Sequence, residues 1–165
     1  MNIIFQDIDG PLIPARLYFF GGRPTLEGAF FWDPVAVMMI NKLCEMCDAK
    51  IVFNTAHNEN PAEVMRHQAA MNRLGHIHDD CQTEYPKQSS RFKAIENWLE
   101  KHPEVKGWVV IDDMPVHNTN QVKVDFDIGM TLNNFNQAVE ILTGIKPSSI
   151  ISGIGVPLDV ALEKK

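Results

Sequence analysis

Three short apolar runs constrain the fold of this chain more than any other feature. They are residues 3–5, 51–53 and 108–111, and each is a continuous stretch of aliphatic or aromatic residues. Such runs are typical of strands buried on both faces, as in a parallel sheet covered by helices. Residues 122–126 instead alternate apolar and charged side chains, which indicates an edge strand with one face in water. We also expect a strand near residues 76–78.

Helical patterns lie between and after these runs. Asp33 and Pro34 form a typical helix start, and the predicted apolar face that follows is Val35, Met38, Met39, Leu43 and Met46. Further helices are expected after Asn60, after a cap at Ser90 and around Phe135. Strands that alternate with helices predict an α/β three-layer sandwich around a mostly parallel, Rossmann-like sheet.

The length and composition of the chain fit one globular domain. The 165 residues are 45% hydrophobic, and we expect one main domain over residues 1–143 with a tail, 144–165, packed on it or trailing from it. A net charge of -6 gives no global basic surface for nucleic acid. With three cysteines, no apolar run long enough to span a membrane and no signal-peptide pattern, a cytoplasmic location is expected.

Acidic and hydroxyl side chains collect where the buried runs end. Asp7 and Asp9 follow the first run, Thr55 follows the second, and Asp112 and Asp113 follow the third. If the strands are parallel, these groups meet at one edge of the sheet, where ligands of α/β folds bind. Four crowded carboxylates need a cation, and Mg²⁺ combines carboxylate ligands with phosphate oxygens of a substrate. The sequence therefore predicts a magnesium site at this edge.

Lys93 is the candidate phosphate-binding cation. It falls in the first turn of the helix capped by Ser90. A positive charge there is repelled by the positive end of the helix dipole, and a bound anion such as phosphate would offset that repulsion. Lys87 is a second candidate for the same role.

These residues, in this order, resemble the four motifs of the haloacid dehalogenase (HAD) superfamily of phosphatases. The matching segments are "IIFQDIDGPL", "IVFNT", "RFKAIENWL" and "WVVIDDMP". Pro11 departs from the usual first motif. The chain is similar in particular to the compact HAD domains grouped with Swiss Army Knife RNA-repair proteins.

The resemblance implies roles for the residues that match the motifs. Asp7 is expected to be the nucleophile that forms an aspartyl-phosphate, and Asp9 the general acid and base. Thr55 and Lys93 are expected to hold the transferring phosphoryl group. The implied Mg²⁺ ligands are Asp7, the backbone carbonyl of Asp9, Asp112 and Asp113.

The resemblance also bears on the substrate. Many HAD phosphatases carry a cap domain, but residues 12–32 and 58–86 are too short to hold one. In the family, capless members act on large or open substrates or oligomerise to cover the site, so a nucleotide or a phosphorylated nucleic-acid end is a candidate. Gly10, Ala56, His57 and Arg16 are the predicted substrate contacts. Arg16 lies in a predicted flap with Arg23, Tyr18, Phe19 and Phe20.

Two alternatives stay open at this point. A non-catalytic HAD fold or a receiver-like module would bind phosphate without hydrolysis, although in receiver domains the acidic pair comes first and the lysine last. A zinc protein could use Cys44 and Cys47 with His76, His78 and Cys81.

Overall fold

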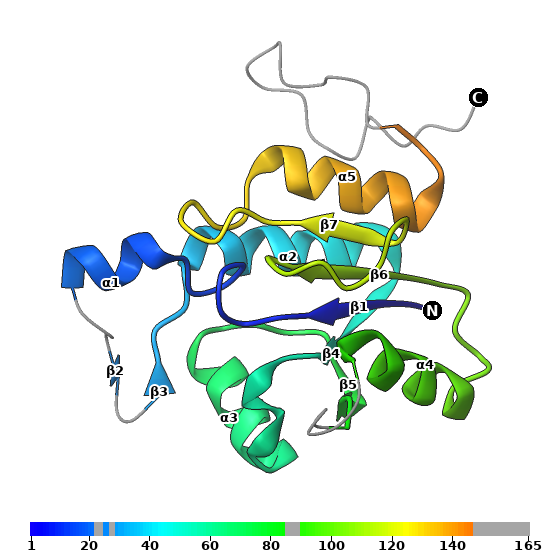
Figure 1. The fold of residues 1–165 in the computed structure, drawn as a ribbon, viewed down its shortest axis with the longest axis horizontal. Helices are drawn as coiled ribbons and strands as arrows, with labels where there is room; N and C mark the ends of the chain where they lie inside the picture. Colours follow the sequence, from blue (N-terminus) through cyan, green and yellow to red (C-terminus); the bar gives the residue numbers. More distant parts are fainter. Residues whose placement is uncertain (22–24, 27–28, 85–89, 147–165) are drawn as a thin grey trace.

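The protein is described by a computed structural model covering residues 1–21, 25–26, 29–84 and 90–146. Its centre is a five-stranded sheet in the order β5-β4-β1-β6-β7, in which every neighbouring pair is parallel (Figure 1). The strands are β1 (Asn2–Gln6), β4 (Ala49–Phe53), β5 (Ile77–Gln82), β6 (Gly107–Asp112) and β7 (Gln121–Lys123). The three apolar runs form β1, β4 and β6, the three central strands, so the predicted buried strands are confirmed.

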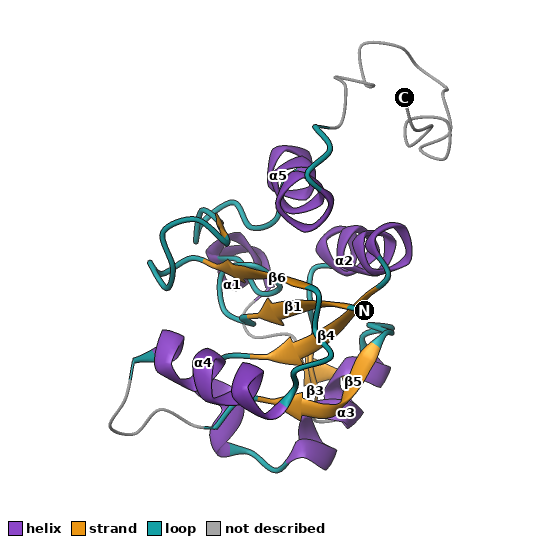
Figure 2. Cartoon of the chain, turned by 90° about the vertical axis from the view of Figure 1, so that its right-hand side faces the viewer, coloured by secondary structure: helices purple, strands orange, loops and turns teal. Residues whose placement is uncertain are grey.

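Helices cover both faces of the sheet. Figure 2 shows α2 (Pro34–Cys47) and α5 (Leu132–Thr143) on one side and α4 (Arg91–Lys101) on the other. A further helix, α3 (Ala62–Met71), packs against β5. This arrangement confirms the predicted three-layer α/β sandwich with a Rossmann-like parallel sheet.

Alternate residues of the central strands serve two separate cores. Ile4 and Ile51 point into the larger core with α2 and α5, while Ile3 and Val52 point into a smaller one with α4. Neighbouring residues are thus buried on opposite faces, which explains why the apolar runs are continuous.

The apolar face of α2 that is buried differs from the predicted one. Val35 and Met38 were expected in the core but are exposed, and the buried residues are Ala36, Val37, Ile40, Leu43, Cys44 and Cys47. Apolar side chains surround most of this helix, so periodicity alone does not set its rotation. Asp33 does fix its start, because the Asp33 carboxylate accepts a hydrogen bond from the Val35 amide at 2.9 Å.

The edge strand β7 is shorter than the alternation predicted. Val122 and Val124 are buried as expected, but Phe126 is exposed. The chain turns away after Val124 because the Asp125 carboxylate accepts hydrogen bonds from the amides of Asp127 and Ile128 at 2.9 and 3.0 Å.

The two insertions are small. The first contains α1 (Ala15–Gly21) and a two-stranded antiparallel ribbon of β2 (Thr25–Leu26) and β3 (Ala29–Phe30), and the second contains a 3-10 helix (Ala56–Glu59), α3 and β5. Among the described residues neither insertion forms a separate domain. The predicted tail begins at Gly144, which caps α5, and residues 147–165 lie outside the described part. No helix in that part is both long and apolar enough to cross a bilayer.

Candidate active site

Three carboxylates meet at the carboxyl ends of two neighbouring strands. Asp7 directly follows β1, Asp112 ends β6 and Asp113 comes next. One oxygen from each of the three lies within 4.8 Å of the others. The parallel pairing of β1 with β6 brings them together, as the sequence predicted.

Burial dominates the electrostatics of this cluster. Asp7 and Asp112 are 2% and 0% exposed. The pKa of Asp7 is raised because burial outweighs the attraction of Arg91 and a weaker effect of the Thr55 side chain. Burial, followed by the charge of Asp7, raises the pKa of Asp112 to about 7, although Arg91 opposes the shift. Two adjacent buried carboxylates therefore depend on a nearby cation to stay ionised.

Arg91 supplies a cation that the sequence reasoning missed. Its Nη1 donates to Asp7 Oδ2 at 3.0 Å and to Asp112 Oδ2 at 2.5 Å. The structure does not bring Lys93 to these oxygens: its Nζ lies 3.3 Å from Glu96 Oε2, and its side chain is 51% exposed. Ser90 caps the helix as expected, accepting from the Lys93 amide at 3.2 Å. Lys87 lies outside the described residues.

Gly10 permits the loop after β1 to approach the cluster. Its φ is +84°, and a Cβ atom there would lie 2.9 Å from the Cβ of Asp113. Any other residue would be strained in this backbone conformation and would push Asp113 away. The glycine of the first motif is thus required by close packing, whether or not it also contacts a substrate.

Asp9 is separate from the cluster of Asp7, Asp112 and Asp113 and faces outward. Its side chain is 38% exposed, and Oδ2 lies 3.1 Å from His57 Nε2. Tyr18 donates its hydroxyl to Oδ1 at 3.4 Å. A carboxylate two residues beyond Asp7, exposed and held by neighbours, is positioned to exchange protons with a bound molecule.

Thr55 and Ala56 lie where β4 ends. Thr55 is buried and its hydroxyl accepts from the His57 amide at 3.3 Å, which starts the 3-10 helix. Ala56 is exposed at the rim beside His57. The loop after β4 therefore contributes the predicted hydroxyl and the predicted histidine to the same edge.

Comparison with models of known protein families identifies the family of this chain. The model of a family described as the HAD domain in Swiss Army Knife RNA repair proteins matches residues 3–135. The chain belongs to this family. Searches among curated proteins and among solved structures returned no match.

The HAD domain has oxygen ligands suited to Mg²⁺. Oδ1 of Asp7 is buried and has no hydrogen-bond partner among the described residues, which is costly unless something binds it. Together with Asp112 and Asp113 it offers a set of carboxylate oxygens, the donor type that Mg²⁺ prefers. The donors present therefore fit the metal that the family implies.

The residues of the predicted flap that the structure describes do not all face the proposed site. Arg16 forms an ion pair with Asp33, so it ties α1 to the start of α2 instead of pointing at the carboxylates. Phe19 is 84% exposed, whereas Tyr18 reaches Asp9. Arg23 and the side chain of Phe20 lie outside the described residues.

A cleft opens beside Arg91 at the edge of the HAD site. It has a volume of about 510 Å³ and is lined by Ser90, Arg91, Phe92, Met114, Pro115 and Val116. Arg91 thus contacts both the cleft and the buried carboxylates.

The prediction of a cysteine-based zinc site is wrong, because no such cluster forms among the described residues. Cys44 and Cys47 are buried on the core side of α2, and Cys81 is a buried residue of β5. His76 is exposed, and His78 lies near His102 and Glu104 with no cysteine among them.

Proposed function

We propose that this HAD domain is a Mg²⁺-dependent phosphohydrolase that works through an aspartyl-phosphate on Asp7. One observation carries the proposal: carboxylate oxygens of buried Asp7 and Asp112 and of half-buried Asp113 converge, and Oδ1 of Asp7 has no partner within the described chain. Bound Mg²⁺ would lower the repulsion between an anionic nucleophile and an anionic substrate. Its proposed ligands are Asp7, the backbone carbonyl of Asp9, Asp112 and Asp113.

The first step uses Asp7 and Asp9. An oxygen of Asp7 attacks phosphorus in line with the leaving oxygen, so the new bond to Asp7 forms as the phosphoester bond breaks. Asp9 gives its proton to the leaving oxygen. The exposed position of Asp9 suits this role, because its carboxyl group can reach a substrate that enters from solvent.

The second step releases phosphate. Asp9, now ionised, takes a proton from water as that water attacks phosphorus, and Asp7 leaves as a free carboxylate. His57 lies 3.1 Å from Asp9 and would hold it in position through both steps. Asp7 is then a free carboxylate again, and Asp9 again carries a proton.

A cation and a hydroxyl would stabilise the transferring phosphoryl group. Thr55 is the proposed hydroxyl. For the cation, the geometry favours Arg91 over the sequence-based candidate Lys93, because Arg91 already contacts Asp7 while Lys93 pairs with Glu96. A guanidinium also presents several donors to phosphate oxygens at once.

We propose a phosphorylated nucleic-acid end or nucleotide as the substrate. The family description names RNA repair, and the open cleft beside Arg91 has room for more than a phosphate group. Phe92 lines this cleft and offers an aromatic surface for a base, in addition to the phosphate contact from Arg91. Gly10, Ala56 and His57 would border the phosphate from the opposite loops.

Hydrolysis assays test the proposal. p-Nitrophenyl phosphate and oligonucleotides with a 5′- or 3′-phosphate are incubated with the wild type and with Asp7→Asn, in Mg²⁺ or in chelator. We expect phosphate release that requires both Mg²⁺ and Asp7, with a higher kcat/KM for an oligonucleotide than for the small ester. Release that survives Asp7→Asn would refute the nucleophile, and no release from any of these substrates would favour a phosphate-binding role.

A further inference from the structure

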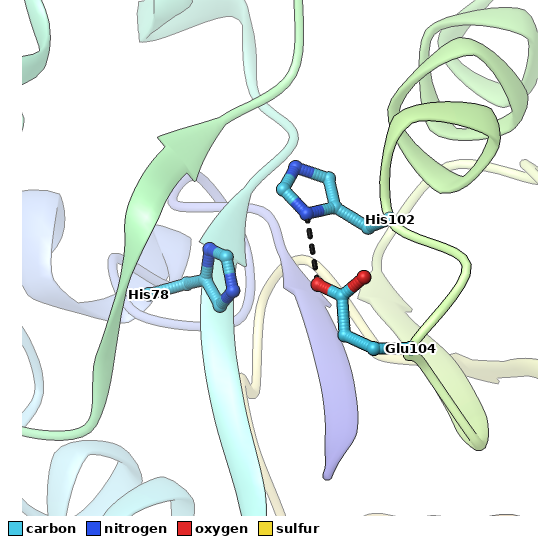
Figure 3. Close-up of side chains that lie close together, drawn as sticks. All are labelled: His78, His102 and Glu104. Atoms are coloured by element: carbon cyan, nitrogen blue, oxygen red, sulfur yellow. Dashed lines mark hydrogen bonds and ion pairs between the residues drawn. The ribbon is translucent and has the colours of Figure 1, made fainter.

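A second group of metal-ligating side chains lies far from the carboxylates in the sheet. His78 is the second residue of β5, His102 caps the end of α4, and Glu104 precedes β6. One ligand atom of each lies within 4.8 Å of the others, and Figure 3 shows the three side chains converging. These positions are near the amino ends of parallel strands, whereas Asp112 lies at the carboxyl end of β6. The group is therefore distinct from the proposed active site.

Asp80 contacts the outer nitrogen of both imidazoles. Its Oδ2 lies 3.1 Å from His102 Nε2, and its backbone carbonyl oxygen lies 3.1 Å from His78 Nδ1. An oxygen acceptor on one ring nitrogen favours the tautomer whose other nitrogen carries a free lone pair, as around metal-bound histidines. The alternative tautomer of His78 would accept from the Asp80 amide at 3.0 Å. A cation at Nε2 would select the first tautomer.

The inner atoms of His102 and Glu104 are spaced like neighbouring ligands of one ion, and a ring nitrogen of His78 lies within 4.8 Å of them. His102 Nδ1 lies 3.1 Å from Glu104 Oε1, and two ligands of a tetrahedral Zn²⁺ with bonds of about 2.1 Å lie about 3.4 Å apart. Glu104 supplies the carboxylate of the group, and its side chain is 53% exposed. Little movement is needed to replace the hydrogen bond with a metal.

The surroundings hold the two rings in place. His78 is 8% exposed, and His102 stacks on Trp98 with ring centroids 3.8 Å apart. His78 also makes a T-shaped contact with Trp98, at 5.1 Å between ring centroids. A site whose ligands are ordered before binding loses less conformational entropy when the ion binds.

We propose that His78, His102 and Glu104 form a binding site for a divalent transition ion of the Zn²⁺ type, oriented by Asp80. Two imidazoles and one carboxylate favour such an ion over Mg²⁺, which prefers oxygen ligands. The ion would join β5, the end of α4 and the loop before β6. A water molecule would complete its coordination.

Zn²⁺ titration by calorimetry tests this site. Chelator-treated protein is titrated in excess Mg²⁺, which favours the carboxylate cluster, and Glu104→Gln is compared with His67→Gln, an exposed histidine of α3 outside the group. We expect one Zn²⁺ per wild-type chain, binding at least about tenfold weaker in Glu104→Gln and unchanged in His67→Gln. Asp80→Asn should weaken binding about 10–100-fold through the orientation of the His102 ring, the one ring that the Asp80 carboxylate contacts.

Asp112→Asn separates this site from the proposed active site. Zn²⁺ binding should be retained in that variant, and Co²⁺ in place of Zn²⁺ should give visible absorption that is lost in Glu104→Gln. Absence of binding in the wild type, or binding that Glu104→Gln leaves intact, would refute the proposal. Loss in Asp112→Asn but not in Glu104→Gln would assign the ion to the carboxylates instead.

Discussion

Replacing Arg91 with methionine removes the cation from between two buried carboxylates. Nη1 of Arg91 donates to Asp7 at 3.0 Å and to Asp112 at 2.5 Å, and its side chain is 27% exposed. A hydrogen bond to a charged group contributes ~1.5–3 kcal/mol, and breaking a buried ion pair typically costs ~3–5 kcal/mol. Methionine keeps the apolar stem and relieves the desolvation of the guanidinium, so we expect a loss near the lower end, about 3 kcal/mol.

Urea unfolding followed by tryptophan fluorescence measures this loss. In chelator, Arg91→Met should lower the free energy of unfolding by about 3 kcal/mol, equivalent to roughly 6–12 °C in Tm for a domain of this size. In saturating Mg²⁺ the loss should fall to below about half, because an ion bound to the same carboxylates replaces the missing charge.

Lys93→Met is the matched control on the same helix. Lys93 is exposed and pairs only loosely with Glu96, at 3.3 Å, so its removal should cost below about 1 kcal/mol with or without Mg²⁺. The two variants also decide which cation serves phosphoryl transfer: Arg91→Met should abolish hydrolysis and Lys93→Met should not. Equal losses in both variants, or an unchanged stability of Arg91→Met in chelator, would refute this reasoning.

Three further predictions concern single positions. Gly10 has a positive φ, so Gly10→Ala should lower the free energy of unfolding by about 1–2 kcal/mol in urea titrations. As a control, Gly75→Ala should change it far less, because a Cβ atom there would make only an ordinary contact with Asn41. His57→Gln should lower kcat about tenfold in steady-state assays, less than Asp9→Asn, because His57 acts only by positioning Asp9. Burial raises the pKa of Cys44 to about 12, and the other two thiols are buried as well, so none should react with a thiol reagent at pH 8 until the protein unfolds.

The sequence was sufficient to predict the central strands of the sheet and the meeting of three carboxylates at one edge. Continuous apolar runs identified β1, β4 and β6, because a strand covered on both faces must be apolar at every position. The position of Asp7, Asp112 and Asp113 then follows from parallel pairing, since side chains after parallel strands share one edge.

Other features depend on tertiary contacts that local patterns do not encode. Arg91 and Lys93 both fall in the first turn of α4, and only the rotation of the helix against the sheet decides which one reaches Asp7. The sequence did not predict the rotation of α2 for the same reason, since this helix carries apolar residues on most of its sides. His78 and His102 are 24 positions apart, and their proximity requires the packing of α4 beside β5.

The most direct test of the proposed function is to find the phosphoryl group on the chain. The protein is mixed with a phosphomonoester that it hydrolyses in Mg²⁺ and quenched in acid. It is then reduced with borohydride, which converts an aspartyl-phosphate to homoserine, and the modified residue is located by tandem mass spectrometry. The account predicts homoserine at position 7. With p-nitrophenyl phosphate, whose leaving group departs without a proton, there should be more of it in Asp9→Asn, because mainly the second step is then slowed. Hydrolysis with no modification at Asp7 would contradict it.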